Sequence, residues 1–287
     1  VAVGNTEMGQ GARSELAQIA ADALGAPYEM VTVHPVDTTR VPDSGPTVAS
    51  RTTISSGQAV IAAAAPLRQQ LEGVARRLLD SPVSVSEGCF STMGDNHSEL
   101  SFFRVVEQCY AERHPMQSVG QWVTPDTSFD DQGRGDAYAV YAFSATVADV
   151  EVDIETGEID MRDLWVAIDV GRAVNPDQVE AQIEGGTVQA TGYALMEQLI
   201  LDEGRILNPN LSAYIIPTTL DVPPIHPIII ESSYAEGPFG AKGFGEVPMI
   251  GTPAAIANAV ADALGGTERP RHLPITPERV LTVIRDQ

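Results

Sequence analysis

The sequence predicts an α+β fold built as two lobes, residues 1–137 and 138–287. Helical and strand-like patterns both recur along the 287 residues, but they do not alternate as in a doubly wound parallel sheet. A chain of this length with 43% hydrophobic residues can form two modest cores. The boundary is placed after residues 130–136, where glycine and aspartate interrupt the apolar pattern.

Helices and a variable insert are expected in the first lobe. Apolar residues from Leu16 to Leu24 recur at helical spacing, and the stop signals Gly25 and Pro27 follow them. The expected elements are a helix between Gly11 and Gly25, a short strand over residues 30–35, a helix over residues 58–79, and an insert over residues 81–137 with short strands and a helix near residues 99–112.

The second lobe is expected to begin with a β-hairpin and to continue with helices. Asp169 and Asn175 are expected to fix turns, because Asn-Pro is a common helix start. The expected elements are strands over residues 138–153 and 158–170 joined by a turn at residues 155–157, a helix over residues 176–199 interrupted at Gly185-Gly186, and an apolar helix over residues 254–264.

Composition narrows the class of function. A formal net charge of −22 argues against nucleic acid or an anionic membrane as partner, because both attract clustered Lys and Arg. Cys89 and Cys109 are the only cysteines and lack metal-ligand spacing, so no iron–sulfur cluster, zinc site or disulfide framework is expected. No apolar run of about 18 residues and no signal peptide is recognisable. A cytoplasmic protein without a membrane span is expected.

One carboxylate stands at the end of a glycine-rich loop. Residues 237–245 hold four glycines in nine positions, and Glu246 follows them. Repeated glycine in a short loop allows close approach of the backbone to a ligand, which makes Glu246 a candidate for catalysis. The alternative is that Glu246 is an ordinary acid at the start of the next helix.

Polar side chains also stand beside other glycine-containing segments. Gln10 lies between two glycines, Ser50 ends a short loop, and Gln182 precedes Gly185-Gly186. Amides and hydroxyls of this kind, with glycine N–H groups, suit a polar cofactor that carries phosphates. As isolated residues they would be turn or capping groups. No segment has the spacing of a dinucleotide-binding or P-loop motif.

Taken in order, six motifs resemble the C-terminal molybdopterin-binding domain of the xanthine dehydrogenase and aldehyde oxidase family. The resemblance covers nearly the whole chain and loosens between residues 81 and 134. The motifs are Glu7-Met-Gly-Gln-Gly11, Pro46-Thr-Val-Ala-Ser-Arg51, Asp169-Val-Gly-Arg-Ala-Val-Asn-Pro176, Gln182-Ile-Glu-Gly-Gly186, Gly240-Ala-Lys-Gly-Phe-Gly-Glu246 and Leu273-Pro-Ile-Thr-Pro277.

The resemblance implies roles for particular residues. Glu246 would be the catalytic base that takes a proton from the water-derived nucleophile. The cofactor would be molybdopterin with molybdenum, in its cytosine dinucleotide form, with the metal held by the pterin dithiolene and not by protein side chains. For Lys242 a solvent-facing position remains the alternative. The residues implied in cofactor binding are Gly9, Gln10, Gly11, Thr47, Val48, Ala49, Ser50, Gln182, Lys242, Gly243 and Gly245.

The resemblance also implies partner subunits. In the family's catalytic subunit a large domain normally precedes this one, and it does not occur in the sequence. Nicotinate dehydrogenase is a relative in which two polypeptides share this catalytic subunit. A larger molybdopterin chain, an iron–sulfur subunit and an FAD subunit are therefore expected as partners in a hetero-oligomer.

Three functions stay open on the sequence. The first is a subunit of a molybdenum hydroxylase or dehydrogenase that hydroxylates an N-heterocyclic aromatic or an aldehyde, using water. The second is a reductive enzyme of the same family acting on an aromatic thioester. The third is a cofactor-holding scaffold without catalysis, against which the complete Glu246 loop argues.

Overall fold

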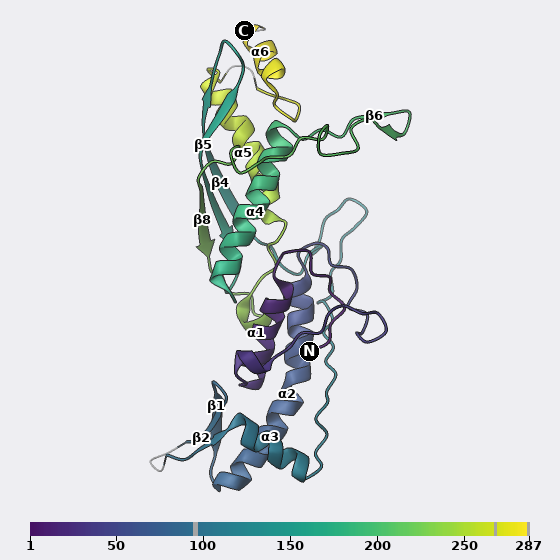
Figure 1. Cartoon of the computed structure of the whole chain (residues 1–287), viewed down its shortest axis with the longest axis vertical. Coiled ribbons are helices and arrows are strands. Elements are labelled where there is room, and N and C mark those ends of the chain that lie inside the picture. Colours follow the sequence, from purple (N-terminus) through teal and green to yellow (C-terminus); the bar gives the residue numbers. More distant parts are fainter. Residues whose placement is uncertain (94–96, 267–268, 286–287) are drawn as a thin grey trace. The chain divides into compact units, whose positions relative to one another are not determined.

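The computed structural model describes residues 1–93, 97–266 and 269–285. The chain forms an α+β fold, as predicted, and divides into two compact units (Figure 1). Each unit is described by itself below. The first unit contains residues 1–141 and 232–243, and the second contains residues 142–231 and 244–287.

This division differs from the predicted lobes in two ways. The first break falls after Tyr141 and not after residue 137, and residues 232–243, which we expected in the second lobe, belong to the first unit. The segment returns because it packs on the first unit's long helix. A Cβ added at Gly57 would lie 2.8 Å from Pro238 Cγ, and Gln58 Nε2 donates to the carbonyl oxygen of Glu236 at 2.8 Å.

Two helices form the body of the first unit. Helix α1, Ala12–Leu24, begins after Gly11 and ends at Gly25, both in the left-handed region that favours glycine (φ 79° and 73°). Helix α2, Thr52–Leu79, begins six residues before the predicted start. Its first turns bury Ser and Thr as well as Ile54, so hydrophobic periodicity did not reveal them.

The predicted variable insert has its own small core. Strands β1 (Val83–Ser86), β2 (Cys89–Thr92) and β3 (Glu99–Ser101) form an antiparallel sheet, and helix α3 (Phe102–Ala111) follows. Phe90 and Val105 are fully buried there together with Val74 of α2. The expected strand at residues 30–35 was wrong: a 3₁₀ turn, η1 (Tyr28–Met30), and irregular chain occupy this part.

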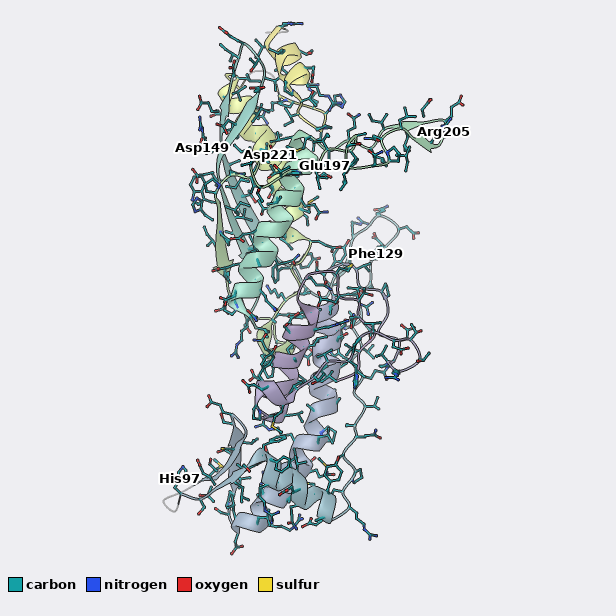
Figure 2. All side chains as sticks on the ribbon, in the orientation of Figure 1. His97, Phe129, Asp149, Glu197, Arg205 and Asp221 are labelled. Carbon is teal, nitrogen blue, oxygen red and sulfur yellow. The ribbon has the colours of Figure 1, made fainter. Side chains whose placement is uncertain are left out.

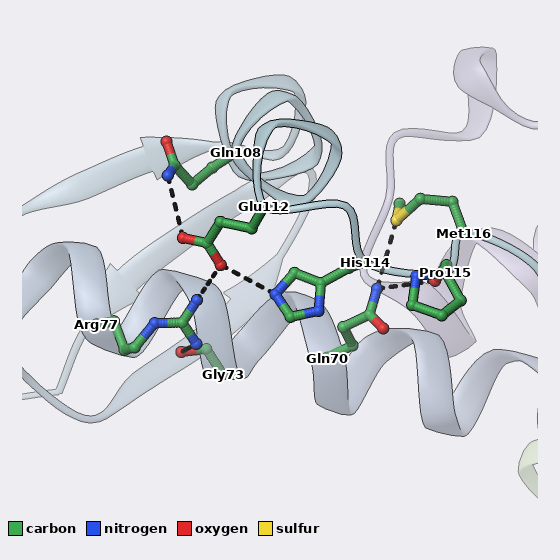
Figure 3. Close-up of polar contacts among 8 residues, drawn as sticks. All are labelled: Gln70, Gly73, Arg77, Gln108, Glu112, His114, Pro115 and Met116. Atoms are coloured by element: carbon green, nitrogen blue, oxygen red, sulfur yellow. Dashed lines mark hydrogen bonds and ion pairs between the residues drawn. The ribbon is translucent and has the colours of Figure 1, made fainter.

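Polar contacts pin the segment after α3 to helix α2 (Figure 3). The Glu112 carboxylate pairs with Arg77 and accepts from Gln108 Nε2 at 3.0 Å, and His114 Nε2 lies 2.9 Å from it. Hydrogen bonds from Gln108 and His114 lower the pKa of Glu112. Gln70 Nε2, on α2, donates to the carbonyl oxygen of Pro115, the residue after His114, at 3.0 Å. These bonds fix where the extended chain after α3 begins.

The second unit is a three-stranded sheet covered on one face by helices. Strands β4 (Ser144–Val152) and β5 (Ile159–Asp169) form the predicted hairpin, and β8 (Ile225–Ile230) pairs with β5 in parallel. Leu164, Val166 and Ile168 point from β5 into the core. Strand β4 begins six residues after the predicted Tyr138, because residues 138–141 belong to the first unit.

Helices α4 (Pro176–Leu195) and α5 (Val247–Ala263) lie along one face of this sheet (Figure 1). The predicted start of α4 is confirmed, since Asn175 Oδ1 accepts the N–H of Gln178 at 3.1 Å. The predicted interruption at Gly185-Gly186 is wrong, because the helix continues through both residues. Gly186 instead permits close packing of the helices: a Cβ there would lie 2.9 Å from Pro248 Cβ.

The remaining elements are short. A two-residue hairpin, β6 (Leu201–Asp202) and β7 (Arg205–Ile206), follows α4, and helix α6 (Pro277–Arg285) ends the described chain. A 3₁₀ turn, η2 (Pro238–Gly240), lies in the segment that returns to the first unit. Among the residues that the structure describes, none of the helices is both long and apolar enough to cross a bilayer.

Candidate cofactor and catalytic site

The loop at Gly9-Gln10-Gly11 is organised by a carboxylate that sequence analysis did not single out. Glu7 Oε1 accepts the backbone N–H groups of Gly9 and Gly11, each at 3.0 Å, and Oε2 accepts that of Arg13 at 3.0 Å. Burial alone would raise the pKa of Glu7, but these three N–H groups and the Arg13 charge lower it below its ordinary value. Glu7 thus fixes both the loop and the first turn of α1.

This arrangement corrects one expectation. We expected the glycine N–H groups of this loop to be available to cofactor phosphates, but those of Gly9 and Gly11 already bind Glu7. The sequence does contain the acid that binds them: Glu7 stands two residues before Gly9 and four residues before Gly11. It has no recognised spacing, so only the folded loop reveals it.

Gln10 is held on its own loop. Its Oε1 accepts the N–H of Met8 at 2.6 Å, and its Nε2 donates to the carbonyl oxygen of Thr6 at 2.8 Å. A side-chain amide has two N–H donors, so one remains for a ligand beyond the bond to Thr6. The loop therefore presents an amide of fixed orientation.

A second loop, residues 47–50, is attached directly to the chain before the first. Thr47 Oγ1 accepts the N–H of Thr6 at 2.9 Å. The residue before Thr6 makes two further contacts: Asn5 Oδ1 accepts from the hydroxyl of Ser56, and Asn5 Nδ2 lies 3.4 Å from Thr52 Oγ1. Asn5 and Ser56 are buried, so these bonds are shielded from water. Two segments about forty residues apart in sequence are brought together in this way.

The second loop ends in two residues of unusual backbone conformation. Ala49 and Ser50 have φ of 53° and 51°, in the left-handed region that non-glycine residues seldom occupy. Val48 is 54% exposed beside them. Such strain persists only where surrounding contacts fix it, and helix α2 begins two residues later.

The returning segment supplies a third loop to the same unit. A Cβ added at Gly243 would lie 1.6 Å from the carbonyl oxygen of Ser50, so only glycine fits. Lys242 is 8% exposed, and its Nζ donates to the carbonyl oxygen of Tyr141 at 3.2 Å. The alternative of a solvent-facing lysine is therefore wrong.

In the second unit, Gln182 and Glu246 lie on the two packed helices. Gln182 Nε2, on α4, donates to the carbonyl oxygen of Gly245 at 3.1 Å. Glu246 is the N-cap residue of α5, but its side chain makes no capping hydrogen bond. An acid at this position can favour the helix dipole without such a bond, so the alternative of an ordinary helix-start acid stays open. Glu246 is exposed.

The twelve predicted site residues thus fall into two groups. Gln182, Gly245 and Glu246 lie in the second unit, and the other nine lie in the first. Within the first unit, three loops from distant parts of the sequence converge by hydrogen bonds and by the fit of Gly243 against Ser50. The chain passes from the first unit to the second between Gly243 and Phe244.

Chemically, each group has a clear capability. The first provides an oriented amide, a hydroxyl and small exposed side chains at Val48 and Ala49, which suit an extended polar ligand. The second group provides the exposed carboxylate of Glu246, and the carbonyl of Gly245 directly before it is held by Gln182. Among the described residues, no group of three or more His, Cys, Asp and Glu has metal-binding geometry.

A family model described as the molybdopterin cofactor-binding domain matches residues 1–223. The crystal structure of quinoline 2-oxidoreductase from Pseudomonas putida 86 superposes with a TM-score of 0.83 over 98% of this chain and 36% of that chain, at 32% identity.

Two relatives of known sequence show the same pattern. The nicotine 6-hydroxylase large subunit of Paenarthrobacter nicotinovorans is 33% identical over 97% of this chain and 34% of its own length. A subunit of a probable xanthine dehydrogenase from Bacillus subtilis (strain 168) is 33% identical over 98% of this chain and 37% of its own length. The chain therefore spans about a third of the length of these relatives.

Proposed function

Because the chain belongs to the family of molybdopterin cofactor-binding domains, we propose that it is the part of a molybdenum hydroxylase that holds the pterin and carries the general base. The observation that carries the proposal is the state of Glu246. Glu246 is exposed at the start of α5, and the carbonyl group directly before it in the chain, that of Gly245, is held by Gln182.

The residues of the first unit fit the cofactor. The pterin and its phosphates would be held by the loops of Gly9, Gln10 and Gly11, of Thr47–Ser50 and of Lys242–Gly243. Gln182 and Gly245 are also proposed as cofactor-binding residues. The glycine at 243 is required by the Ser50 carbonyl, and Gln10 has one amide hydrogen left for a ligand. When bound, the molybdenum centre supplies the redox chemistry that accepts two electrons from substrate.

Glu246 acts as the base in this proposal. Its carboxylate accepts a proton from the water-derived nucleophile as that oxygen attacks an electron-poor carbon of the substrate. General-base assistance of this kind contributes typically about 10²–10⁴ in rate. Small side chains at Val48 and Ala49 leave space for substrate.

We infer an N-heterocyclic aromatic or an aldehyde as substrate. Relatives named for nicotine and quinoline, at 33% and 32% identity, support the heterocycle. We further propose that the cofactor is the cytosine dinucleotide form, that the first lobe holds it and that the second lobe bears the base. The proposed location is the cytoplasm. The partners are a larger molybdopterin chain, an iron–sulfur subunit and an FAD subunit.

The test is the composition of the assembly that forms around this chain. The complex purified through a tag on this chain should contain about one molybdenum per chain, and acid hydrolysis should release CMP in equal amount. A complex that lacks both molybdenum and pterin would overturn the proposal. Turnover with an electron acceptor and not with a donor would exclude the reductive alternative.

A further inference from the structure

An arm, defined as residues 197–222, projects from the helix-and-sheet body of the second unit. It contains β6 and β7, and Figure 2 labels Glu197 at its start, Asp221 near its end and Arg205 at its tip. A hairpin with two-residue strands is too short to be stable by pairing alone. Its conformation must come from other contacts.

Hydrogen bonds within the arm provide the contacts that fix its conformation. Asn208, its one buried residue, accepts the N–H of Ile200 at 2.9 Å and donates to the carbonyl oxygen of Gln198 at 2.7 Å. Tyr214 donates its hydroxyl to Glu197 Oε2 at 2.7 Å. The base of the arm is thus closed by side-chain hydrogen bonds and not by an apolar core.

The apolar side chains of the arm point into solvent. All nine leucines and isoleucines between residues 199 and 220 are exposed, from 42% for Ile216 to 95% for Leu220. An ordered segment with its polar groups bonded internally and its aliphatic groups outward has the composition of an interface core. A free surface of this kind would favour aggregation.

Charge indicates what covers it. The chain carries a net charge of −22, and the arm itself holds Glu197, Asp202, Glu203, Arg205 and Asp221, for a net −3. Docking of a second copy would bring two strongly acidic chains together, which is unfavourable. A partner other than a second copy, with an apolar groove for the exposed leucines and isoleucines, is favoured.

The longer relatives indicate such a partner. They extend over about two thirds of their length beyond the part that this chain matches, since it covers 34% and 37% of them. We propose that the arm docks in an apolar groove of that remaining part of the molybdopterin subunit, whether it is a separate chain or a further domain. This inference rests on the proposed function, because the partner is defined by it.

Photocrosslinking in the purified holoenzyme tests the arm. Benzoylphenylalanine is placed at position 211 in place of Leu211, which is 70% exposed, and crosslinked peptides are sequenced by mass spectrometry. We expect peptides from the remaining part of the molybdopterin subunit. Peptides from a second copy of this chain, peptides from the iron–sulfur or FAD subunit, or no crosslink would overturn the proposal.

A substitution pair measures the strength of the contact. Leu211→Ser combined with Leu220→Ser should weaken association with the remaining part of the molybdopterin subunit at least about tenfold, measured as affinity or as resistance of a domain contact to limited proteolysis. The control is Ile154→Ser, at a site 65% exposed in the β4–β5 turn, which should change neither. Equal behaviour of arm and control variants would contradict the proposal.

Molybdenum and pterin are measured on the crosslinked sample. An assembly that crosslinks as expected but contains no pterin would leave the arm contact standing and overturn the proposed function. An assembly loaded with molybdenum whose arm crosslinks elsewhere would overturn the arm contact alone.

Discussion

Gln182 Nε2 donates to the carbonyl oxygen of Gly245 at 3.1 Å, one residue before Glu246. The bond joins α4 to Gly245, two residues before the start of α5, beside the close approach of Gly186 to Pro248. Gln182 therefore fixes the peptide that leads into Glu246. A residue first considered for its contact with the cofactor also positions the proposed base.

Gln182→Ala should lower molybdenum content per chain several-fold. The substitution removes a partly buried hydrogen bond, worth about 1 kcal/mol, and frees the peptide before Glu246. The measurement is metal analysis of the purified complex together with urea unfolding. Gln189→Ala, an exposed glutamine on the same helix, is the control and should change neither. Full molybdenum content and unchanged activity in Gln182→Ala would show that its contact is dispensable.

Glu7→Gln should destabilise the Gly9-Gln10-Gly11 loop and lower cofactor retention. An amide has one acceptor oxygen and no charge, so it cannot accept all three N–H groups that Glu7 binds. Because the carboxylate is only partly buried, we expect a loss of about 1 kcal/mol at neutral pH. Glu29→Gln, an exposed acid elsewhere in the unit, is the control.

The effect of Glu7 should depend on pH. The pKa of Glu7 is lowered on folding, so its contribution to stability is present above its unfolded pKa, about 4.3, and is lost as pH falls through its folded pKa. The difference in unfolding free energy between wild type and Glu7→Gln should therefore be full at pH 7 and shrink below about pH 4. A difference independent of pH would mean that the carboxylate charge has no part in it.

Gly243→Ala and Gly185→Ala should have opposite effects. A Cβ at Gly243 would meet the Ser50 carbonyl at 1.6 Å, which forces the backbone to move and should cost about 2–3 kcal/mol along with cofactor binding. A Cβ at Gly185 meets nothing within 4 Å, and the residue lies in a helix, so alanine should stabilise by about 0.5–1 kcal/mol. Thermal unfolding of both variants, with molybdenum analysis, checks the pair. Equal tolerance of alanine at both positions would contradict the close approach.

Local signals explain what could be predicted. Helix α1 lies between two glycines, the β4–β5 hairpin shows alternation around a turn, and Asn175 precedes a proline; each signal lies within a few residues of the structure it predicts. The motifs likewise indicated the cofactor family, whose model matches most of the chain.

Non-local contacts explain what could not. The return of residues 232–243 to the first unit depends on Gly57 and Gln58, about 180 residues away, and the parallel pairing of β8 with β5 has no local pattern. The role of Glu7 depends on the folded course of its own loop.

Anaerobic single-turnover reduction of the Glu246→Gln complex tests the central claim most directly. Glutamine keeps the volume of the side chain and removes the base, so molybdenum content should match wild type while substrate reduces the metal at least about 10²-fold more slowly. Glu180→Gln, an exposed acid on α4, should reduce at the wild-type rate. A fully loaded Glu246→Gln complex reduced within a few-fold of wild type would contradict the account and assign the base to another residue.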